Sequence, residues 1–294
     1  MDLRQLRYLV ALGEEQHFTR AARRLGIAQP ALSQQIKRLE LQVGVPLVER
    51  STRSVRMTDA GLTTIAGARR VLREVDALTD ELDALRGARS GRVTLGITRT
   101  PGAVDVAALL ARFSLAHPGV ELDVREELTV DLLGMLEAGG LDLALVAEGP
   151  PTDHRRLDVR TVASEPLVVI VPAGHELAAR RGVSVGDLAP HRIVTFHRGA
   201  TIRRQLDEHA FAAGVVLRVA FEIADAQRAR SMVASGLGVG VLPSSDARAE
   251  GPEVEIVPFR DAALVHRTAV ATPRDRRPTP AAAALLALIE GAVA

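Results

Sequence analysis

From about residue 91 onward, short apolar runs alternate with longer amphipathic stretches. The runs have the length of buried strands, and the stretches have the three- and four-residue spacing of helices. The strand-like runs are Val93–Ile97, Leu122–Val124, Leu141–Val146, Leu167–Val171, Ile193–Phe196, Val239–Leu242 and Val265–Ala271. The helical patterns are Ala103–Ala116, Val130–Ala138, Thr201–Ala213 and Gln227–Ser235, with a last helix opened by Thr279-Pro280. This alternation favours an α/β architecture in which helices cover parallel sheets.

A single long helix is predicted for residues 59 to about 89, which contain no proline. Its apolar residues form a narrow stripe with charges on both sides: Ile65, Ala68, Leu72, Val75, Leu78, Leu82 and Leu85. A narrow stripe on a long polar helix indicates pairing with a partner helix. Packing on the chain's own body would give the same pattern, and that alternative stays open. Gly87 and Arg89-Ser90-Gly91 predict a flexible joint after the helix.

Two short helices joined by a turn are predicted between residues 18 and 40. Thr19 is a candidate N-cap of the first helix, and Gly26 supplies the turn. The second helix begins near Gln29, with Pro30 tolerated in its first turn. Its apolar residues share an inner face and its polar residues an outer one: Leu32, Ile36 and Leu39 inside, Ser33, Gln34, Lys37 and Arg38 outside. Gln, Ser, Lys and Arg are the side chains that reach base edges and phosphates, so the outer face favours DNA recognition over an ordinary solvated surface.

Two short strands are expected after these helices. They occupy residues 44–50 and 51–58, with a turn at Ser51-Thr52-Arg53. Such a hairpin beside a helix-turn-helix is a wing. Arg50 and Arg53 are its candidate DNA contacts, and Arg53 at the tip is suited to a narrow minor groove.

Charge is concentrated in the N-terminal part of the chain. The 294 residues carry a net charge of +1. Residues 1–60 alone hold ten Arg or Lys against six Asp or Glu, an excess of four. A basic head on a near-neutral body suits double-stranded DNA as a partner.

Composition excludes several other kinds of chemistry. The chain has no cysteine, so disulfides, thiolate metal sites and cysteine nucleophiles are impossible, and the scattered histidines predict no metal site. No apolar run could span a bilayer and the first residues are charged, which predicts a cytoplasmic protein. The glycines of Gly236-Leu237-Gly238-Val239-Gly240 follow a helical pattern and precede a strand, the reverse of a nucleotide-binding loop. We therefore expect no cofactor and no catalytic residue, and treat an enzyme as the weaker hypothesis.

Dense motifs in the first sixty residues resemble those of LysR-type transcriptional regulators. They comprise Leu3, Leu6 and Tyr8, then Phe18-Thr19-x-Ala21-Ala22-x-x-Leu25, Gln29-Pro30-Ala31-Leu32-Ser33-x-Gln35-Ile36-x-x-Leu39-Glu40, and Thr58-x-Ala60-Gly61. The similarity continues in outline to the C-terminus. There Gly236-x-Gly238-Val239-Gly240-Val241-Leu242-Pro243 looks like the family's effector-domain signature. The segment His175-Glu176-Leu177-Ala178 departs slightly, because a proline more often follows that histidine.

The resemblance implies the domain organisation. A winged helix-turn-helix would occupy residues 1–58, a dimerising linker helix residues 59–90, and a two-lobed α/β domain like the type II periplasmic binding proteins residues 91–294. Lobe I would comprise 91–162 and 267–294, and lobe II 163–266, with crossings near Val162 and Arg267. It also implies a homodimer, possibly a homotetramer, and contact with RNA polymerase if the protein is an activator. A regulator that needs no ligand is a further alternative.

Two loops are candidates for binding a small anionic effector, most simply a carboxylate. They are Thr98–Gly102 and Phe196–Thr201, and each is expected to lead into a helix N-terminus, which favours anions. With few aromatics in the chain, a stacking cage is not expected, although Phe196 could pack against one ring. The candidate effector contacts are Thr98, Arg99, Thr100, Thr129, Phe196, His197, Thr201 and Gln227. Thr100, Thr129 and Thr201 match the family's ligand positions, although each could instead be only a helix cap.

Overall fold

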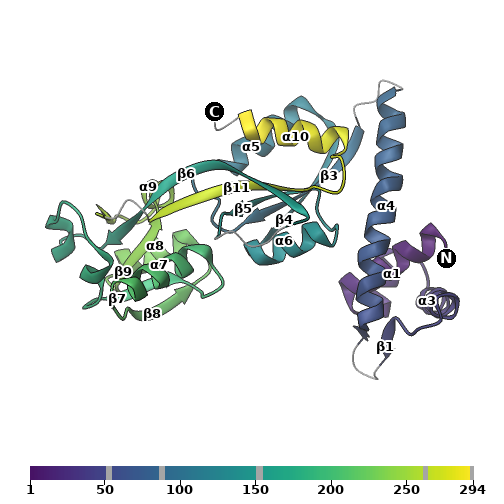
Figure 1. The fold of residues 1–294 in the computed structure, drawn as a ribbon, viewed down its shortest axis with the longest axis horizontal. Coiled ribbons are helices and arrows are strands. Elements are labelled where there is room, and N and C mark those ends of the chain that lie inside the picture. Colours follow the sequence, from purple (N-terminus) through teal and green to yellow (C-terminus); the bar gives the residue numbers. More distant parts are fainter. Residues whose placement is uncertain (51–54, 86–89, 150–154, 261–263, 292–294) are drawn as a thin grey trace. The chain divides into compact units, whose positions relative to one another are not determined.

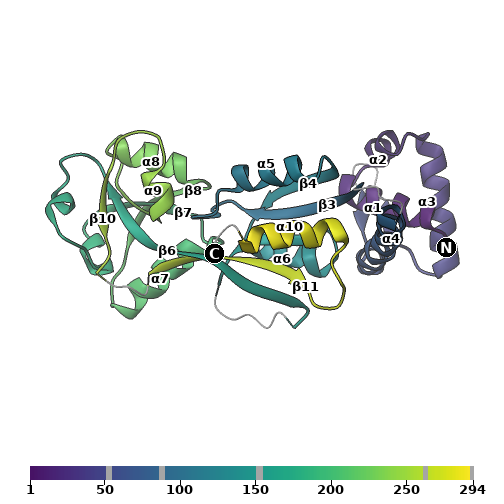
Figure 2. The same ribbon diagram turned by 90° about the horizontal axis from the view of Figure 1, so that it is seen from above.

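The computed structural model describes residues 1–50, 55–85, 90–149, 155–260 and 264–291. The chain forms two compact units, which we call the N-terminal and the C-terminal unit. Figures 1 and 2 show the elements of each unit in two orthogonal views. In the described part of the chain, no helix has both the length and the apolar character that a membrane crossing requires.

The N-terminal unit contains four helices and a short hairpin. They are α1 (Leu3–Glu15), α2 (Phe18–Arg24), α3 (Gln29–Val43), β1 (Val48–Arg50), β2 (Val55–Met57) and α4 (Asp59–Leu85). The core is built from the apolar faces of α1 and α3, the small residues of α2 and the first turns of α4. Ala21 and Ala22 are buried because α2 lies close against its neighbours. The two helices, the turn at Gly26 and the pairing of two short strands are those the sequence predicted, whereas the predicted turn at Ser51-Thr52-Arg53 lies outside the described residues.

Helix α2 begins two residues earlier than expected and is not capped by Thr19. Its N-cap is His17, whose Nδ1 accepts a hydrogen bond from the backbone N–H of Thr19 at 3.2 Å. An imidazole nitrogen thus replaces the hydroxyl that the pattern favoured. Gly26 does form the turn, with a φ of +67° that a side chain rarely adopts.

Helix α4 divides its apolar stripe between two environments. Ile65 is buried in the core of the N-terminal unit, and Ala68, one turn further along, is buried as well. Further along, Leu78 and Leu82 are 57% and 48% exposed. Packing on the chain's own body therefore accounts for the first part of the stripe, while the second part remains available for a partner.

The C-terminal unit is an α/β structure in two lobes. Its elements are β3 (Ser90–Thr98), α5 (Val106–Ala116), β4 (Gly119–Glu127), α6 (Thr129–Glu137), β5 (Leu143–Ala147), β6 (Leu157–Val171), η1 (Glu176–Ala179), η2 (Val185–Leu188), β7 (Arg192–Phe196), α7 (Thr201–Ala212), β8 (Arg218–Ile223), α8 (Ala226–Ala234), β9 (Val239–Pro243), α9 (Ser244–Arg248), β10 (Glu255–Pro258), β11 (Val265–Pro273) and α10 (Pro280–Gly291). The strand order is β4-β3-β5-β11-β6-β9-β7-β8, and β10 also pairs with β6. Lobe I is built on β3, β4 and β5, and lobe II on β7, β8, β9 and β10.

Strands β6 and β11 connect the lobes. The two are antiparallel to each other over Leu157–Pro166, so the sheet is mixed and not purely parallel. Beyond that stretch β6 pairs with β9 and β10 in lobe II. Within it, the other edge of β11 pairs with β5 in lobe I. The apolar pattern revealed only Leu167–Val171 of β6, because its first half alternates between buried and exposed residues.

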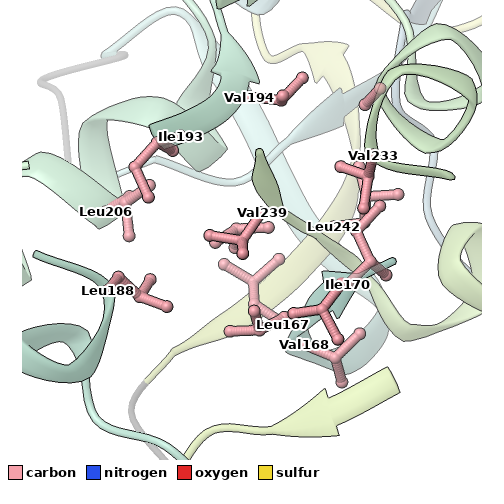
Figure 3. Close-up of a cluster of buried hydrophobic side chains, with 14 of the residues drawn as sticks. Leu167, Val168, Ile170, Leu188, Ile193, Val194, Leu206, Val233, Val239 and Leu242 are labelled. Atoms are coloured by element: carbon pink, nitrogen blue, oxygen red, sulfur yellow. The ribbon is translucent and has the colours of Figure 1, made fainter. Parts of the chain in front are cut away.

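Each lobe has a hydrophobic core of its own. In lobe I, α5 and α10 pack on one face of the sheet and α6 packs on the other (Figure 1). In lobe II, Leu167, Ile193 and Leu242 belong to one cluster that also buries Leu206 of α7 and Val233 of α8 (Figure 3). Because the two cores are separate, each lobe can keep its packing while the lobes rotate relative to each other.

The exposed half of the α4 stripe gives a first prediction. Replacing Leu78 and Leu82 by Glu places charges in the proposed helix pairing, where they lack partners. We expect the molar mass measured by light scattering to fall, while the thermal unfolding of the C-terminal unit is retained. Thr79→Glu is the control, because Thr79 is exposed on the same helix but outside the stripe. An unchanged mass for the double variant would show that this stripe is not the contact between copies.

Candidate functional site

The outer face of α3 is the candidate nucleic-acid interface. Leu32, Ile36 and Leu39 are fully buried on the inner face. The outer face exposes Gln34, Lys37 and Arg38, with Ser33 half-buried beside them. The sequence therefore sorted the two faces of α3 correctly, and its polar face points away from the core.

The start of α3 adds donors for an anion. Gln29 and Pro30 are exposed in its first turn, and Ala28 at the N-cap makes no side-chain capping bond. Backbone N–H groups at an uncapped helix start can bind a phosphate. Thr19, in the first turn of α2, is also exposed.

The hairpin is fixed to α3 by a carboxylate that the sequence analysis did not single out. Glu40 Oε1 accepts hydrogen bonds from the N–H groups of Leu47 and Val48, at 2.9 and 3.1 Å. This holds the start of β1 against the end of α3. Arg50 ends β1 opposite Val55 of β2, whereas Arg53 lies outside the described residues.

Two basic residues of this unit have a structural role. Arg24 and Arg69 bond to the two oxygens of Glu14, at 2.7 and 2.9 Å. Burial raises the pKa of Glu14, but the hydrogen bonds from Arg69 and Arg24 outweigh it, and the net shift is downward. Arg24 thus joins α2 to α1, which removes it from the set of free cations on this unit.

A small cavity lies between the lobes of the C-terminal unit. It has a volume of about 20 Å³, little more than the space of one water molecule. The predicted Thr98, Arg99, Thr100, Thr129, Phe196, His197 and Thr201 all line it, together with Leu128, Ala147, Gly199, Ala200 and Ala224. The two predicted loops therefore do meet at one place. The small apolar lining residues carried no signal in the sequence.

Hydroxyl groups dominate the chemistry of this cavity. Thr98 and Thr100 are 5% and 8% exposed. Thr129 Oγ1 accepts a hydrogen bond from the N–H of Ala147 at 3.1 Å, which leaves its own proton available for a ligand. Thr201 is the first residue of α7, whose N-cap Ala200 makes no side-chain bond. The start of α7 thus offers uncapped N–H groups as well.

The loop 98–102 does not lead directly into a helix, contrary to the sequence-based expectation. Helix α5 begins at Val106, and the carboxylate of Asp105 caps it by accepting from the N–H of Ala108 at 2.9 Å. An anionic cap already satisfies that helix start, so only α7 fits the helix-terminus argument for this pair of loops. The loop instead contributes hydroxyls and the guanidinium of Arg99, which is 4.0 Å from Glu127 Oε2.

Gln227 is not brought to the cavity. It lies in the first turn of α8, and its Nε2 donates to the backbone oxygen of Glu250 at 3.2 Å. The capping Asp225 directs the start of α8 by accepting from the N–H of Arg228. The lining of the cavity takes only Ala224 from this part of the chain.

A buried polar cluster lies where β6 and β11 leave one lobe for the other, and the sequence analysis missed it. Glu165 and His266 are 8% and 1% exposed. Burial lowers the pKa of His266. Burial, and next the negative charge of Glu165, raise the pKa of Asp246 to about 6. A glutamate two residues before the apolar run Leu167–Val171 was the available signal.

Family models match both parts of this architecture. Residues 3–62 match the bacterial regulatory helix-turn-helix protein model of the lysR family, and residues 86–294 match the LysR substrate binding domain. Fold and site thus define a DNA-binding transcription regulator with an effector-binding domain. The chain belongs to the LysR family.

Individual relatives span nearly the whole chain. It is 33% identical over 285 residues to the uncharacterized regulator YnfL of Escherichia coli, covering 96% of this chain and 95% of YnfL. It is 33% identical over 278 residues to the E. coli dual regulator OxyR, covering 91% and 90%. A full-length OxyR variant from Pseudomonas aeruginosa superposes with a TM-score of 0.77 at 28% identity, covering 100% and 94%. CbnR, at 22% identity and a TM-score of 0.71 over the full length of both chains, shares the fold.

The raised pKa of Asp246 predicts a pH-dependent stability. Folding tightens proton binding to this carboxyl, so its contribution is fully present below about pH 4 and is lost as the pH rises to about 6. Asp246→Asn should therefore raise the unfolding temperature of the full chain at pH 7.5, with little effect near pH 4. Asp225→Asn is the control, because Asn can keep the cap of α8. Equal effects of Asp246→Asn at both pH values would contradict the assignment.

Proposed function

We propose that this regulator reads operator DNA with α3 and that a small anionic effector, a carboxylate in the simplest case, binds in the cavity between the lobes. The single observation that carries the effector part is the convergence of Thr98, Thr100, Thr129 and Thr201 on one cavity. Helix caps alone would have no reason to meet there from both lobes.

The middle of α3 is proposed to recognise bases, and residues on and near the rest of the helix are proposed to contact phosphates. Gln34 and Ser33 are the proposed base readers, since amide and hydroxyl groups match base edges in the major groove. Lys37, Arg38 and the exposed start of α3 are proposed to contact phosphates, as are Thr19 and Arg50. Arg53 is proposed to enter a narrow minor groove. The basic excess of residues 1–60 supports this assignment.

The cavity favours a compact ligand with accepting oxygens. Threonine hydroxyls, the N–H groups at the start of α7, Arg99 and His197 supply donors on all sides. Leu128, Ala147 and Ala224 leave room for only a short apolar body. The cavity of about 20 Å³ shares Thr129, Ala147, Gly199 and Thr201 with a larger hollow of about 1080 Å³, from which a ligand can approach. Binding within the small cavity itself would involve rotation of the lobes about β6 and β11.

Pairing of two α4 helices is the proposed basis of the homodimer. It would bring two copies of α3 to one DNA molecule, and a pair of such dimers would form the homotetramer. Contact with RNA polymerase applies if the protein activates transcription. The exposed Leu78 and Leu82 support the helix pairing.

A thiol-based response to peroxide is not part of the proposal. Several relatives are hydrogen peroxide-inducible genes activators, at 33–35% identity. This chain contains no cysteine, and so it has no thiol that peroxide could oxidise. Its effector is therefore expected to bind reversibly.

The division of labour on α3 is testable by substitution. Gln34→Ala should cost about 1–3 kcal/mol on a DNA fragment selected from a random pool and relax its base preference. Lys37→Ala should weaken selected and random DNA by similar factors. Gln42→Ala, also exposed but at the far end of α3, should leave both affinities unchanged. Equal losses on selected and random DNA for Gln34→Ala would refute its role as a base reader.

The effector site is testable by thermal shift. A panel of small carboxylates (acetate, succinate and benzoate among them) is added to the full chain, and the one that raises the unfolding temperature most is titrated. Thr100→Val and Thr201→Val keep the side-chain shape but remove a hydroxyl, which should weaken binding by about 1–3 kcal/mol each. Thr94→Val, on β3 but outside the cavity, is the control. A ligand that binds both variants as tightly as wild type would place its site elsewhere.

A further inference from the structure

Glu165 and His266 lie opposite each other on the two strands that connect the lobes. They are directly paired residues of β6 and β11. The pairing of β6 with β11 ends one position later, at Pro166 and Val265. The next residue of β6, Leu167, pairs with β9 of lobe II. The pair is therefore located at the point about which the lobes would rotate, and it is buried there.

On the lobe I side, residues of β11 form hydrogen bonds with the backbone of the loop 98–102. His266 Nε2 lies 3.0 Å from the backbone oxygen of Thr100, and Thr268 Oγ1 donates to the backbone oxygen of Pro101 at 2.8 Å. The next residue is Gly102, at a φ of +61°. A Cβ there would lie 2.7 Å from both Glu165 Oε1 and His266 Cδ2. The loop thus rests directly on the strand pair, and a side chain at residue 102 would push it away.

On the lobe II side, Glu165 holds the start of α9. Its Oε2 accepts from Ser244 Oγ at 2.9 Å and from the N–H of Ser245 at 2.6 Å, and its Oε1 accepts from Ser245 Oγ at 2.8 Å. Both carboxylate oxygens bond to lobe II, and Oε1 also lies close to the backbone of Gly102 in lobe I, since a Cβ added there would come within 2.7 Å of it. One side chain therefore contacts elements of both lobes.

The surroundings of the pair keep His266 in one protonation state. A carbonyl oxygen only accepts, so His266 carries its proton on Nε2, and burial keeps it from gaining a second. Asp246 is the other acidic group of the cluster, and Arg248 of α9 donates from Nη1 to the backbone oxygen of Ser244 at 3.4 Å. Thr268 and the two serines are neutral donors.

We propose that Glu165, His266 and Thr268 form a hinge latch that couples the position of the loop 98–102 to the orientation of the two lobes. Movement of the lobes about β6 and β11 would displace the loop, and displacement of the loop would strain the same hydrogen bonds. These residues are positioning residues and touch no ligand. Loop 98–102 lines the effector cavity. The inference rests on the proposed function only in that effector binding would then act on the orientation of the lobes through this loop.

The orientation of the lobes can be measured without an effector. The chain has no cysteine, so Ser114→Cys in α5 and Ser235→Cys at the end of α8 give two unique spin-label sites, both exposed. Dilution with unlabelled full-length chain removes distances between copies. Double electron–electron resonance then reports the distance between lobe I and lobe II. For the otherwise unchanged chain we expect one narrow distance distribution.

Glu165→Ala and Thr268→Val should shift the mean distance and abolish the narrow peak. Glu165→Gln should retain it, because the Ser245 hydroxyl can turn to accept from the amide. The controls are Glu222→Ala, which loses a lobe II ion pair with Arg203, and Thr161→Val, which loses a hydrogen bond to Glu148 within lobe I. Both should keep the narrow peak.

A narrow, unshifted peak in Glu165→Ala and Thr268→Val overturns the latch, as does equal broadening in the two controls. If Glu165→Ala loses its thermal unfolding transition, Thr268→Val, which removes a single hydrogen bond, decides the question. None of these outcomes depends on the carboxylate panel. A failed thermal shift therefore refutes the effector proposal without touching the latch, and an unchanged distance distribution does the reverse.

Discussion

The antiparallel pairing of β6 with β11 is the interaction on which the C-terminal unit depends. These two strands carry the chain between lobes and give each lobe an edge on which its own sheet is completed. Two hydrogen-bonded strands resist separation but can twist, so they allow rotation of the lobes while keeping them attached. The cavity lined by Thr100 and Thr201 exists because this connection brings two loops, about a hundred residues apart in sequence, to face each other.

The strand pair also contains buried polar groups, whose removal from water is energetically unfavourable. Burying a carboxylate and an imidazole beside each other is unfavourable unless each finds partners. Glu165 finds three donors at the start of α9, and His266 finds the carbonyl of Thr100. Asp246 Oδ2 and His266 Nδ1 are both buried without a hydrogen-bond partner, and burial together with the charge of Glu165 raises the pKa of Asp246. Polar groups at this point make the orientation of the lobes specific in a way that apolar packing would not.

In the N-terminal unit, the single long helix α4 has two roles. The first turns of α4 complete the small core of α1 to α3 through Ile65, with Ala60 packed against it. Its later turns have no core to cover and expose Leu78 and Leu82. The same stripe therefore stabilises the fold of one copy and provides an apolar surface for association. This explains why its periodicity alone did not distinguish the two roles.

The sequence by itself determined the elements and faces that depend on neighbours along the chain. These include the turn at Gly26, the buried and exposed sides of α3, the cap of α10 at Thr279, and the α/β succession of the C-terminal unit. Periodicity and capping are local, so they can be read from spacing. Tertiary structure decided what depends on distant residues: His17 in place of Thr19 as the cap of α2, the late start of α5, the exclusion of Gln227 from the cavity, and the antiparallel direction of β6 and β11. It also decided the partners of Glu165, because contacts across about eighty residues leave no trace in local spacing.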